Sequence, residues 1–253
     1  MIFVYMIGTA GSGKSTLTGA FQEWCNRHGY DAIAINLDPG ALHLPYEPEV
    51  DVREWISLNE VMKEYNLGPN GAQVVCADML ALNAKELEER ISEYRADYVL
   101  LDTPGQLELF VFRSTGKVIV EQLNKENSLL VFIIDPSLAT TPTNFISQLM
   151  LSATTQFRLM IPLVNVLSKI DIVDEKALEM MLKWGKEPEK LYEEMMMHSS
   201  MQYQFSEGIL SILKEMEAHT SLIPISSETL EGMEDLYTAL QNIFMGGEDL
   251  ERK

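Results

Sequence analysis

The chain has 253 residues, of which 46% are hydrophobic and 23% are charged, and this composition excludes a disordered or collagen-like protein. Lys and Arg number 19 against 38 Asp and Glu, so the formal charge is −19 at pH 7. A surface this acidic repels phosphate backbones, so we expect no direct binding to nucleic acid and favour protein partners with basic faces.

The cysteines and the N-terminal residues bear on the compartment in which the protein works. Cys25 and Cys76 form no CxxC pair, and the four histidines show no HExxH spacing, so a structural zinc site is not expected. We expect both thiols to be reduced and buried. The apolar run 2–7 is too short for the core of a signal peptide or for a membrane span. The sequence therefore predicts a cytoplasmic protein without a membrane partner.

Short apolar runs separated by helical stretches mark the predicted strands. Such nearly continuous runs are typical of strands buried on both faces. Strands that alternate with helices form βαβ units, so we predict the α/β fold class, with a mainly parallel central sheet and helical insertions. We treat 1–253 as a single domain that carries a helical insertion at about 174–218. The predicted strands are 2–7, 32–36, 98–101, 128–134, 163–167 and 222–225.

The turn after the first predicted strand carries a phosphate-binding motif. Residues 8–15 (GTAGSGKS) fit GxxxxGK[ST] at every fixed position, between a buried strand and a helix. Backbone N–H groups of such a loop surround phosphate oxygens, and the helix N-terminus adds positive potential. We expect Lys14 to contact the β and γ phosphates and Ser15 to bind Mg²⁺, so the fold is predicted to be a three-layer P-loop NTPase. The predicted nucleotide-contacting residues of the loop are Gly11, Ser12, Gly13, Lys14, Ser15 and Thr16.

The segment between the second and third strands is mostly helical in pattern. So long a helical return favours a right-handed parallel crossover, which places strand 32–36 beside strand 98–101. Ser57 and Asn83 are each followed by Glu three residues on, the spacing of a capping box, so we expect helices to begin there. Residues 68–71 (GPNG) lie between these starts and predict a break between helices.

Acidic and amide side chains follow the strands that should flank the phosphate loop. Asp102 ends the third strand and is predicted to reach Mg²⁺ directly or through water. Gly105 allows the backbone to approach the γ-phosphate, and Gln106 is placed to orient a water for in-line attack. Asp38 leaves the second strand at the same edge and can face that water or the metal shell, with Glu108 as a further polarising group.

Residues 168–171 (SKID) predict recognition of guanine. The Asp171 carboxylate can accept hydrogen bonds from N1–H and the N2 amino group of guanine, whereas adenine would leave it unpaired. The Lys169 stem is expected to lie against the ring. Ser226, after the last strand, is expected to contact the base oxygen through its backbone N–H. The usual pattern is NKxD, and the Ser at 168 leaves open how the loop is tethered.

In their order along the chain, these motifs resemble the GPN-loop GTPases, a branch of the SIMIBI class of P-loop NTPases. The resemblance extends over nearly the whole chain and is closest to the compact archaeal-type members. It implies that the protein hydrolyses GTP to GDP and phosphate with Mg²⁺, as a homodimer in which loop 68–70 of one subunit enters the site of the other. Asn70 would then meet the phosphate side across the interface. The resemblance depends on 8–15, 36–39, 68–70, 102–108, 168–171 and 224–227.

These assignments define an expected mechanism. Lys14 neutralises developing charge, while Gln106, Asp38 and Glu108 position and polarise the water. No Arg in a phosphate-adjacent motif offers itself as an arginine finger. Asn70 from the partner would replace that function in part, and because a neutral amide stabilises negative charge less than a guanidinium does, we expect slow intrinsic hydrolysis.

The sequence leaves the biological role open between several classes. Seven of the 15 methionines lie within 180–216, which predicts a helical core or dimer interface, or alternatively a groove for client proteins. The favoured function is a GTPase switch that assembles protein complexes of the transcription, replication or repair machinery. A P-loop small-molecule or nucleotide kinase is the alternative, although no Arg-rich lid is evident. An ATP-driven positioning or metal-insertion protein would need cysteines or a membrane helix that this sequence does not show.

Overall fold

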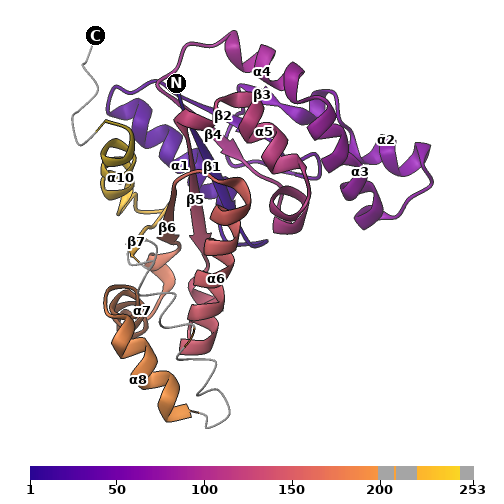
Figure 1. Cartoon of the computed structure of the whole chain (residues 1–253). Helices are drawn as coiled ribbons and strands as arrows, with labels where there is room; N and C mark the ends of the chain where they lie inside the picture. Colours follow the sequence, from indigo (N-terminus) through magenta and orange to yellow (C-terminus); the bar gives the residue numbers. More distant parts are fainter. Residues whose placement is uncertain (199–207, 209–220, 246–253) are drawn as a thin grey trace.

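The computed structural model describes residues 1–198, 208 and 221–245 (Figure 1). Within these residues, seven strands form one sheet in the order β3-β2-β4-β1-β5-β6-β7, and all neighbouring strands are parallel. All six predicted strands are present, so the α/β class and the parallel sheet are confirmed. The strands are β1 (Ile2–Gly8), β2 (Ala32–Asn36), β3 (Val50–Asp51), β4 (Tyr98–Asp102), β5 (Ser128–Ile134), β6 (Leu163–Leu167) and β7 (Leu222–Pro224).

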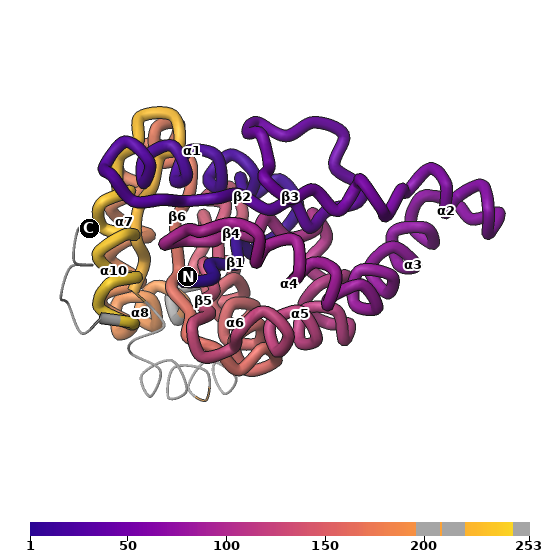
Figure 2. Tube along the Cα trace, turned by 90° about the horizontal axis from the view of Figure 1, so that it is seen from above, coloured from indigo at the N-terminus to yellow at the C-terminus, as the bar shows by residue number. Residues whose placement is uncertain are grey.

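The helices lie in two layers, one on each face of the sheet (Figures 1 and 2). Helices α1 and α10 pack on one face, and α3 to α6 cover the other. The α-helices are α1 (Lys14–Arg27), α2 (Leu58–Glu64), α3 (Pro69–Leu82), α4 (Ala84–Ser92), α5 (Thr115–Leu123), α6 (Pro142–Leu159), α7 (Glu175–Lys186), α8 (Pro188–His198) and α10 (Met233–Met245). Short helical turns are η1 (Val52–Glu54), η2 (Glu108–Phe112), η3 (Lys125–Asn127), η4 (Pro136–Leu138) and η5 (Ile170–Ile172).

Strand β1 explains why the strands read as continuous apolar runs. All seven of its residues are buried. Phe3 and Tyr5 contribute to the core beneath α3 to α6, whereas Val4 and Met6 contribute to the core beneath α1 and α10. Successive side chains of a strand point to opposite faces, so a strand covered on both faces needs an apolar residue at every position.

The crossover from β2 to β4 has both predicted helix starts, but only one of them has the predicted side-chain cap. β2 pairs in parallel with β4, with Asn36 opposite Asp102, as predicted. The Ser57 hydroxyl caps α2 by accepting from the N–H of Glu60. Helix α4 begins directly after Asn83, as predicted, but the capping-box hydrogen bond is absent: this side chain donates to the Met79 carbonyl (2.7 Å) and caps no N–H of α4. Helix α4 follows α3 directly, so Asn83 serves the end of the first helix instead.

Two helical pairs extend from the sheet. Helices α2 and α3 project beyond the β3 edge (Figures 1 and 2), and α7 and α8 extend past the carboxyl ends of the strands (Figure 1). Helices α7 and α8 occupy the described part of the predicted insertion, whose residues 199–207 and 209–218 lie outside the described residues. Met181 and Met195 are buried, which confirms a core role for these two methionines.

Two further expectations concern the thiols and the membrane. Cys25 and Cys76 are both free and buried, as predicted. Across the described ranges, every helix is too short or too polar to cross a lipid bilayer.

Candidate functional site

The phosphate-binding loop joins β1 to α1 at the carboxyl edge of the sheet. Gly11 and Gly13 adopt φ angles of 79° and 99°, the left-handed region that favours glycine. Gly13 is the N-cap of α1, and no side chain caps this helix within the described chain. The first N–H groups of α1 therefore remain for an anion, as the motif predicts. Ser12, in the middle of the loop, is fully buried, whereas Thr16, one turn into the helix, is exposed.

Lys14 points its ammonium group into the loop. It is 5% exposed, and Nζ donates to the carbonyls of Thr9 (2.9 Å), Gly8 (3.1 Å) and Gly105 (3.3 Å). Burial lowers the pKa of Lys14, while the charges of Asp102 and Asp38 act in the opposite direction. A buried cation held mainly by neutral carbonyls interacts strongly with an incoming phosphate.

Asp102 has the surroundings of a metal ligand. Its side chain is buried, and Oδ2 accepts a hydrogen bond from the Tyr46 hydroxyl (2.9 Å). The other oxygen, Oδ1, has no hydrogen-bond partner in the described part of the chain. Burial raises the pKa of Asp102 to about 6, opposed by hydrogen bonds from Ser15 and Tyr46 and by the charge of Lys14. A buried carboxylate oxygen without a partner among the described residues, on a side chain that also interacts with the Ser15 hydroxyl, fits Mg²⁺, which prefers oxygen ligands.

Asp38 connects the ends of β2 and β4. Its Oδ2 accepts from the N–H of Gly105 (3.0 Å) and its Oδ1 from the N–H of Gly40 (2.8 Å). The predicted meeting of Asp38 with the phosphate edge is therefore present. Both carboxylate oxygens bind backbone N–H groups here, so Asp38 organises the loop around Gly105 as well as facing the site. Gln106 and Glu108 follow Gly105 on the same loop and are exposed.

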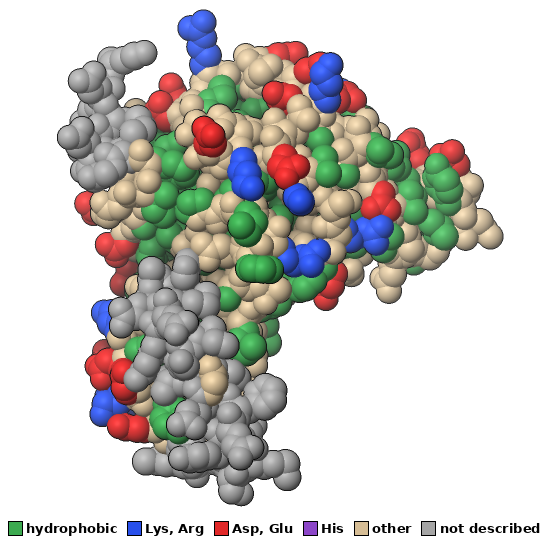
Figure 3. Space-filling view, viewed as in Figure 1, with side chains coloured by type: hydrophobic (Ala, Val, Ile, Leu, Met, Phe, Trp, Pro, Cys, Tyr) green, Lys and Arg blue, Asp and Glu red, His purple; other side chains and the backbone are tan. Residues whose placement is uncertain are grey.

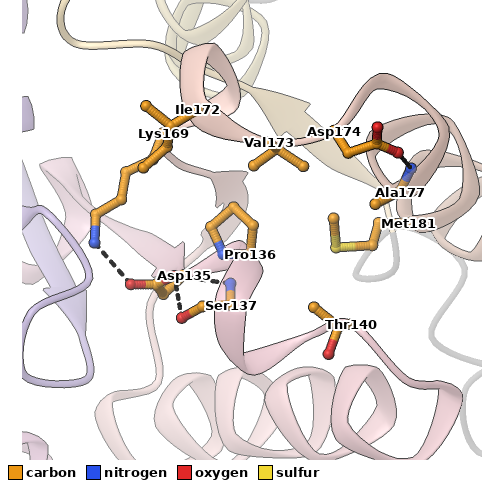
Figure 4. Close-up of a pocket in the computed structure, with 10 residues that line it drawn as sticks. All are labelled: Asp135, Pro136, Ser137, Thr140, Lys169, Ile172, Val173, Asp174, Ala177 and Met181. Atoms are coloured by element: carbon orange, nitrogen blue, oxygen red, sulfur yellow. Dashed lines mark hydrogen bonds and ion pairs between the residues drawn. The ribbon is translucent and has the colours of Figure 1, made fainter.

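The base-reading residues lie on the other side of the phosphate loop. Lys169 donates to the Gly11 carbonyl (2.7 Å) and to Oδ2 of Asp135 (2.7 Å), and its stem passes over Gly13. Burial alone would raise the pKa of Asp135, but hydrogen bonds from Lys169 and from Ser137 hold it below its usual value. Beside this pair is a largely apolar cavity of about 300 Å³ between η4, η5 and α7 (Figure 4). Lys169 and Asp135 lie at one end of it in that view.

Ser226 contributes through its side chain rather than through its N–H. The Ser226 hydroxyl donates to Oδ1 of Asp171 (2.7 Å), while its N–H donates to the carbonyl of Glu231 (3.1 Å). The sequence predicts a backbone contact to the base, but in this structure that N–H is already used. Ser226 therefore orients Asp171, which is exposed at the end of the site.

The tether left open by the SKID sequence is provided by Ser168 itself. Its buried hydroxyl lies 2.8 Å from the Ser12 carbonyl and 3.1 Å from the Ile134 carbonyl. The short serine side chain is thus sufficient to hold the phosphate loop against the ends of β5 and β6.

Among the described residues, no hydrogen bond holds the Asn70 side chain at the nucleotide site of its own subunit. It lies exposed in the first turn of α3, after Gly68 at the N-cap and Pro69 at the first helical position. Pro at this position suits a helix start, since it has no N–H to leave unsatisfied. The GPN sequence thus begins a helix on the projecting α2–α3 pair.

Three residues near the site were not assigned a role from the sequence. Tyr46 reaches Asp102 from the loop between β2 and β3, and Asp135 holds Lys169. Arg53 forms a bidentate ion pair with Asp51. Their i, i+2 spacing in the sequence is a signal from which this pair could have been predicted. Its guanidinium also donates to the Ala41 carbonyl, so it braces the loop that carries Asp38.

The loop geometry and the buried Lys14 place the protein among the P-loop NTPases. A family profile described as "Conserved hypothetical ATP binding protein" matches residues 6–246. The chain is 35% identical over 239 residues to the GPN-loop GTPase PAB0955 of Pyrococcus abyssi, covering 94% of this chain and 95% of that protein. It is 40% identical over 172 residues to the GPN-loop GTPase QQT1 of Arabidopsis thaliana, covering 66% and 58% respectively.

The solved structure of a relative agrees with this match. The crystal structure of PAB0955, a GTPase in apo form, superposes with a TM-score of 0.88 at 34% identity and covers 96% of this chain and 98% of that one. The chain belongs to the GPN-loop GTPase family, and it is a GTP-binding GTPase. The family and the three-layer P-loop NTPase fold inferred from the motifs are therefore confirmed.

Proposed function

We propose that this GTPase is a cytoplasmic homodimer that uses its GTP cycle to assemble or place protein partners, and that Asn70 of each subunit completes the site of the other. The position of Asn70 supports the second part. It is exposed in the first turn of α3, on the α2–α3 pair that projects from the sheet (Figure 1), and its side chain makes no hydrogen bond to another described residue. Tyr65, just before the GPN sequence, is 54% exposed, and Figure 3 shows hydrophobic and acidic side chains together on this projection. Such a projection suits insertion between subunits.

The catalytic roles follow from the site. Ser15 and Oδ1 of Asp102 would hold Mg²⁺, which supplies positive charge to the β and γ phosphates. Lys14 neutralises charge that develops during transfer, because its buried ammonium is already aimed at the loop.

The remaining polar groups act on the water that attacks the γ-phosphate. Asp38, Gln106 and Glu108 orient it, and the Asn70 amide donates to the γ-phosphate from across the interface. Arg53 interacts with Asp38 but is already bound to Asp51 and to Ala41, so it is poorly placed to act as an arginine finger. Slow hydrolysis in the absence of partners is the expected consequence.

Asn70→Ala is expected to lower kcat for GTP by about ten- to a hundred-fold, the scale seen when one donor to transition-state charge is removed. GTP and GDP affinity should stay close to the wild-type value, because Asn70 lies outside the phosphate loop and the base-reading residues. Phosphate release and calorimetry measure the two quantities. Asn59→Ala, an exposed asparagine on α2 of the same projection, is the matched control and should change neither.

Action across the interface is tested with a heterodimer of Asn70→Ala and Lys14→Ala subunits, purified with two different tags. If Asn70 acts on the partner, the Asn70→Ala subunit retains Lys14 and receives Asn70 from its neighbour, so one site of the heterodimer is intact. If Asn70 acts within its own subunit, neither site is intact. An inactive heterodimer would therefore contradict the proposal.

The client-binding part of the proposal is supported by the packing of α6, α7 and α8. A cavity of about 430 Å³ opens between them, lined among others by Met180, Trp184 and Met195. Unbranched thioethers adapt to partners of different shape, so this region suits apolar segments of client proteins. The proposed clients belong to the transcription, replication or repair machinery.

Hydrogen exchange tests whether nucleotide controls that region. Amides of α7 and α8 are expected to exchange about five-fold faster with a GTP analogue than with GDP, since opening a groove breaks local packing. Peptides from α4, which lies far from α7 and α8 (Figure 1), serve as the control. Identical exchange of α7 and α8 in the two states would remove the groove from the proposal.

A further inference from the structure

The hydroxyl of Tyr46 makes a contact that the catalytic roles above do not use. Asp102 is 1% exposed. Rotation about its Cβ–Cγ bond would exchange the two carboxylate oxygens unless a contact distinguishes them. The Tyr46 hydroxyl donates to Oδ2 at 2.9 Å, whereas Oδ1 has no partner among the described residues. The hydrogen bond thus distinguishes the two oxygens of a carboxylate that also interacts with the Ser15 hydroxyl, and it leaves Oδ1 free.

The surroundings show how Tyr46 is brought to this point. Its Cβ lies 3.1 Å from the place where a Cβ on Gly19 would stand, so a side chain at residue 19 would push the loop a few tenths of an ångström away from α1. Gly19 is one helical turn beyond Ser15, and residues four apart share a face of a helix. Tyr46 therefore packs along the same face of α1 that carries the Ser15 hydroxyl.

We propose that Tyr46 is a positioning residue for the magnesium site: its hydroxyl holds Oδ2 of Asp102 and so leaves Oδ1 in a fixed orientation to bind the ion. This inference depends on the proposed Mg²⁺ ligands. Tyr46 belongs to the same loop as Asp38, so it also links the segment around the attacking water to the metal side of the site. Without the hydroxyl, the carboxylate loses its fixed orientation. Mg²⁺ binding must then order the carboxylate as well, which weakens the affinity for Mg²⁺.

The test is Tyr46→Phe, which removes the hydroxyl and keeps the ring. The release of a fluorescent GDP analogue is followed over a series of free Mg²⁺ concentrations. We expect the Mg²⁺ concentration for half-maximal retention to rise roughly ten-fold, the factor that corresponds to one hydrogen bond to a charged group. Release in excess EDTA should match the wild type, because the phosphate-loop and base contacts are unchanged.

Tyr94→Phe is the matched control. The Tyr94 hydroxyl donates to the Glu49 carbonyl, also at 2.9 Å, and so ties down the same loop three residues further along without touching Asp102. Its Mg²⁺ midpoint should equal that of the wild type. In an Asp102→Asn background, Tyr46→Phe should cause no further shift, because Tyr46 acts through that carboxylate. Thermal unfolding of each variant shows whether it is folded.

The possible results separate the explanations. An unchanged midpoint in Tyr46→Phe, or a lower one, would overturn the inference, the second because Tyr46 would then compete with the metal. Faster release by the same factor at every Mg²⁺ concentration, EDTA included, would assign Tyr46 a role in loop shape alone and would also overturn it. If release from the wild type itself does not respond to Mg²⁺, the proposed metal site fails and the inference fails with it.

Discussion

Lys14→Ala is expected to lower GTP hydrolysis by about a thousand-fold, since a buried charge directed at the transferred phosphoryl group stabilises the transition state more than the bound substrate. Nζ of Lys14 lies within 3.3 Å of three carbonyls that converge from the phosphate loop and from Gly105, so its position is fixed before nucleotide binds. Phosphate release at saturating GTP measures the loss.

The control for this variant is Lys117→Ala, which removes an exposed lysine on α5 that pairs only loosely with Glu121 (3.9 Å). It should hydrolyse GTP at the wild-type rate. Because Lys14 is buried, its truncation leaves carbonyl oxygens without their donor, so thermal unfolding must show that the variant is folded. Wild-type turnover by folded Lys14→Ala would refute the assignment of residues 8–15 as the phosphate site.

Asp171→Ala is expected to reduce the preference for GTP over ATP by about 10²- to 10⁴-fold, because sites built on hydrogen bonds to a polar edge discriminate on this scale. Ser226 already donates to Oδ1 of Asp171, which fixes the carboxylate toward the base. The variant should bind GTP more weakly and ATP about as weakly as the wild type does.

Competition between GTP and ATP for a fluorescent nucleotide measures this preference. Glu175→Ala, an exposed acid four residues further along, removes the same charge from the neighbourhood and should keep the wild-type preference. Retention of full discrimination by Asp171→Ala would show that the purine is read elsewhere. That outcome would agree with the "ATP binding" wording of the family description rather than with the guanine assignment.

The strands could be predicted because their burial is uniform. β1, β2, β4 and β5 are buried at every position, so each is visible in the sequence as an apolar run, with polar residues (Asn36, Asp102 and Ser128) only at strand ends. β3 has only two residues and no run to detect. The helix start after Asn83 is correct, but its capping bond is absent, because local spacing cannot show that Asn83 is at once the last cap of α3 and the first of α4.

The site could be predicted where its residues end strands or begin helices. Lys14, Asp38, Asp102 and Asp171 all follow parallel strands closely, and the carboxyl ends of such strands share one edge. Tyr46 could not be found this way, since its contact with Asp102 depends on the path of the loop between β2 and β3. A role for Asn70 in a second subunit cannot be read from any pattern within one chain.

The contacts of the SKID segment join the two ends of the nucleotide site. Lys169 binds the Gly11 carbonyl and Ser168 the Ser12 carbonyl, so the residues that test the purine also hold the loop that wraps the phosphates. Selectivity should therefore be expressed twice, once in how tightly a nucleotide is held and again in how fast it is cleaved. A nucleotide with the wrong base would be not merely a poor ligand but also a badly aligned substrate.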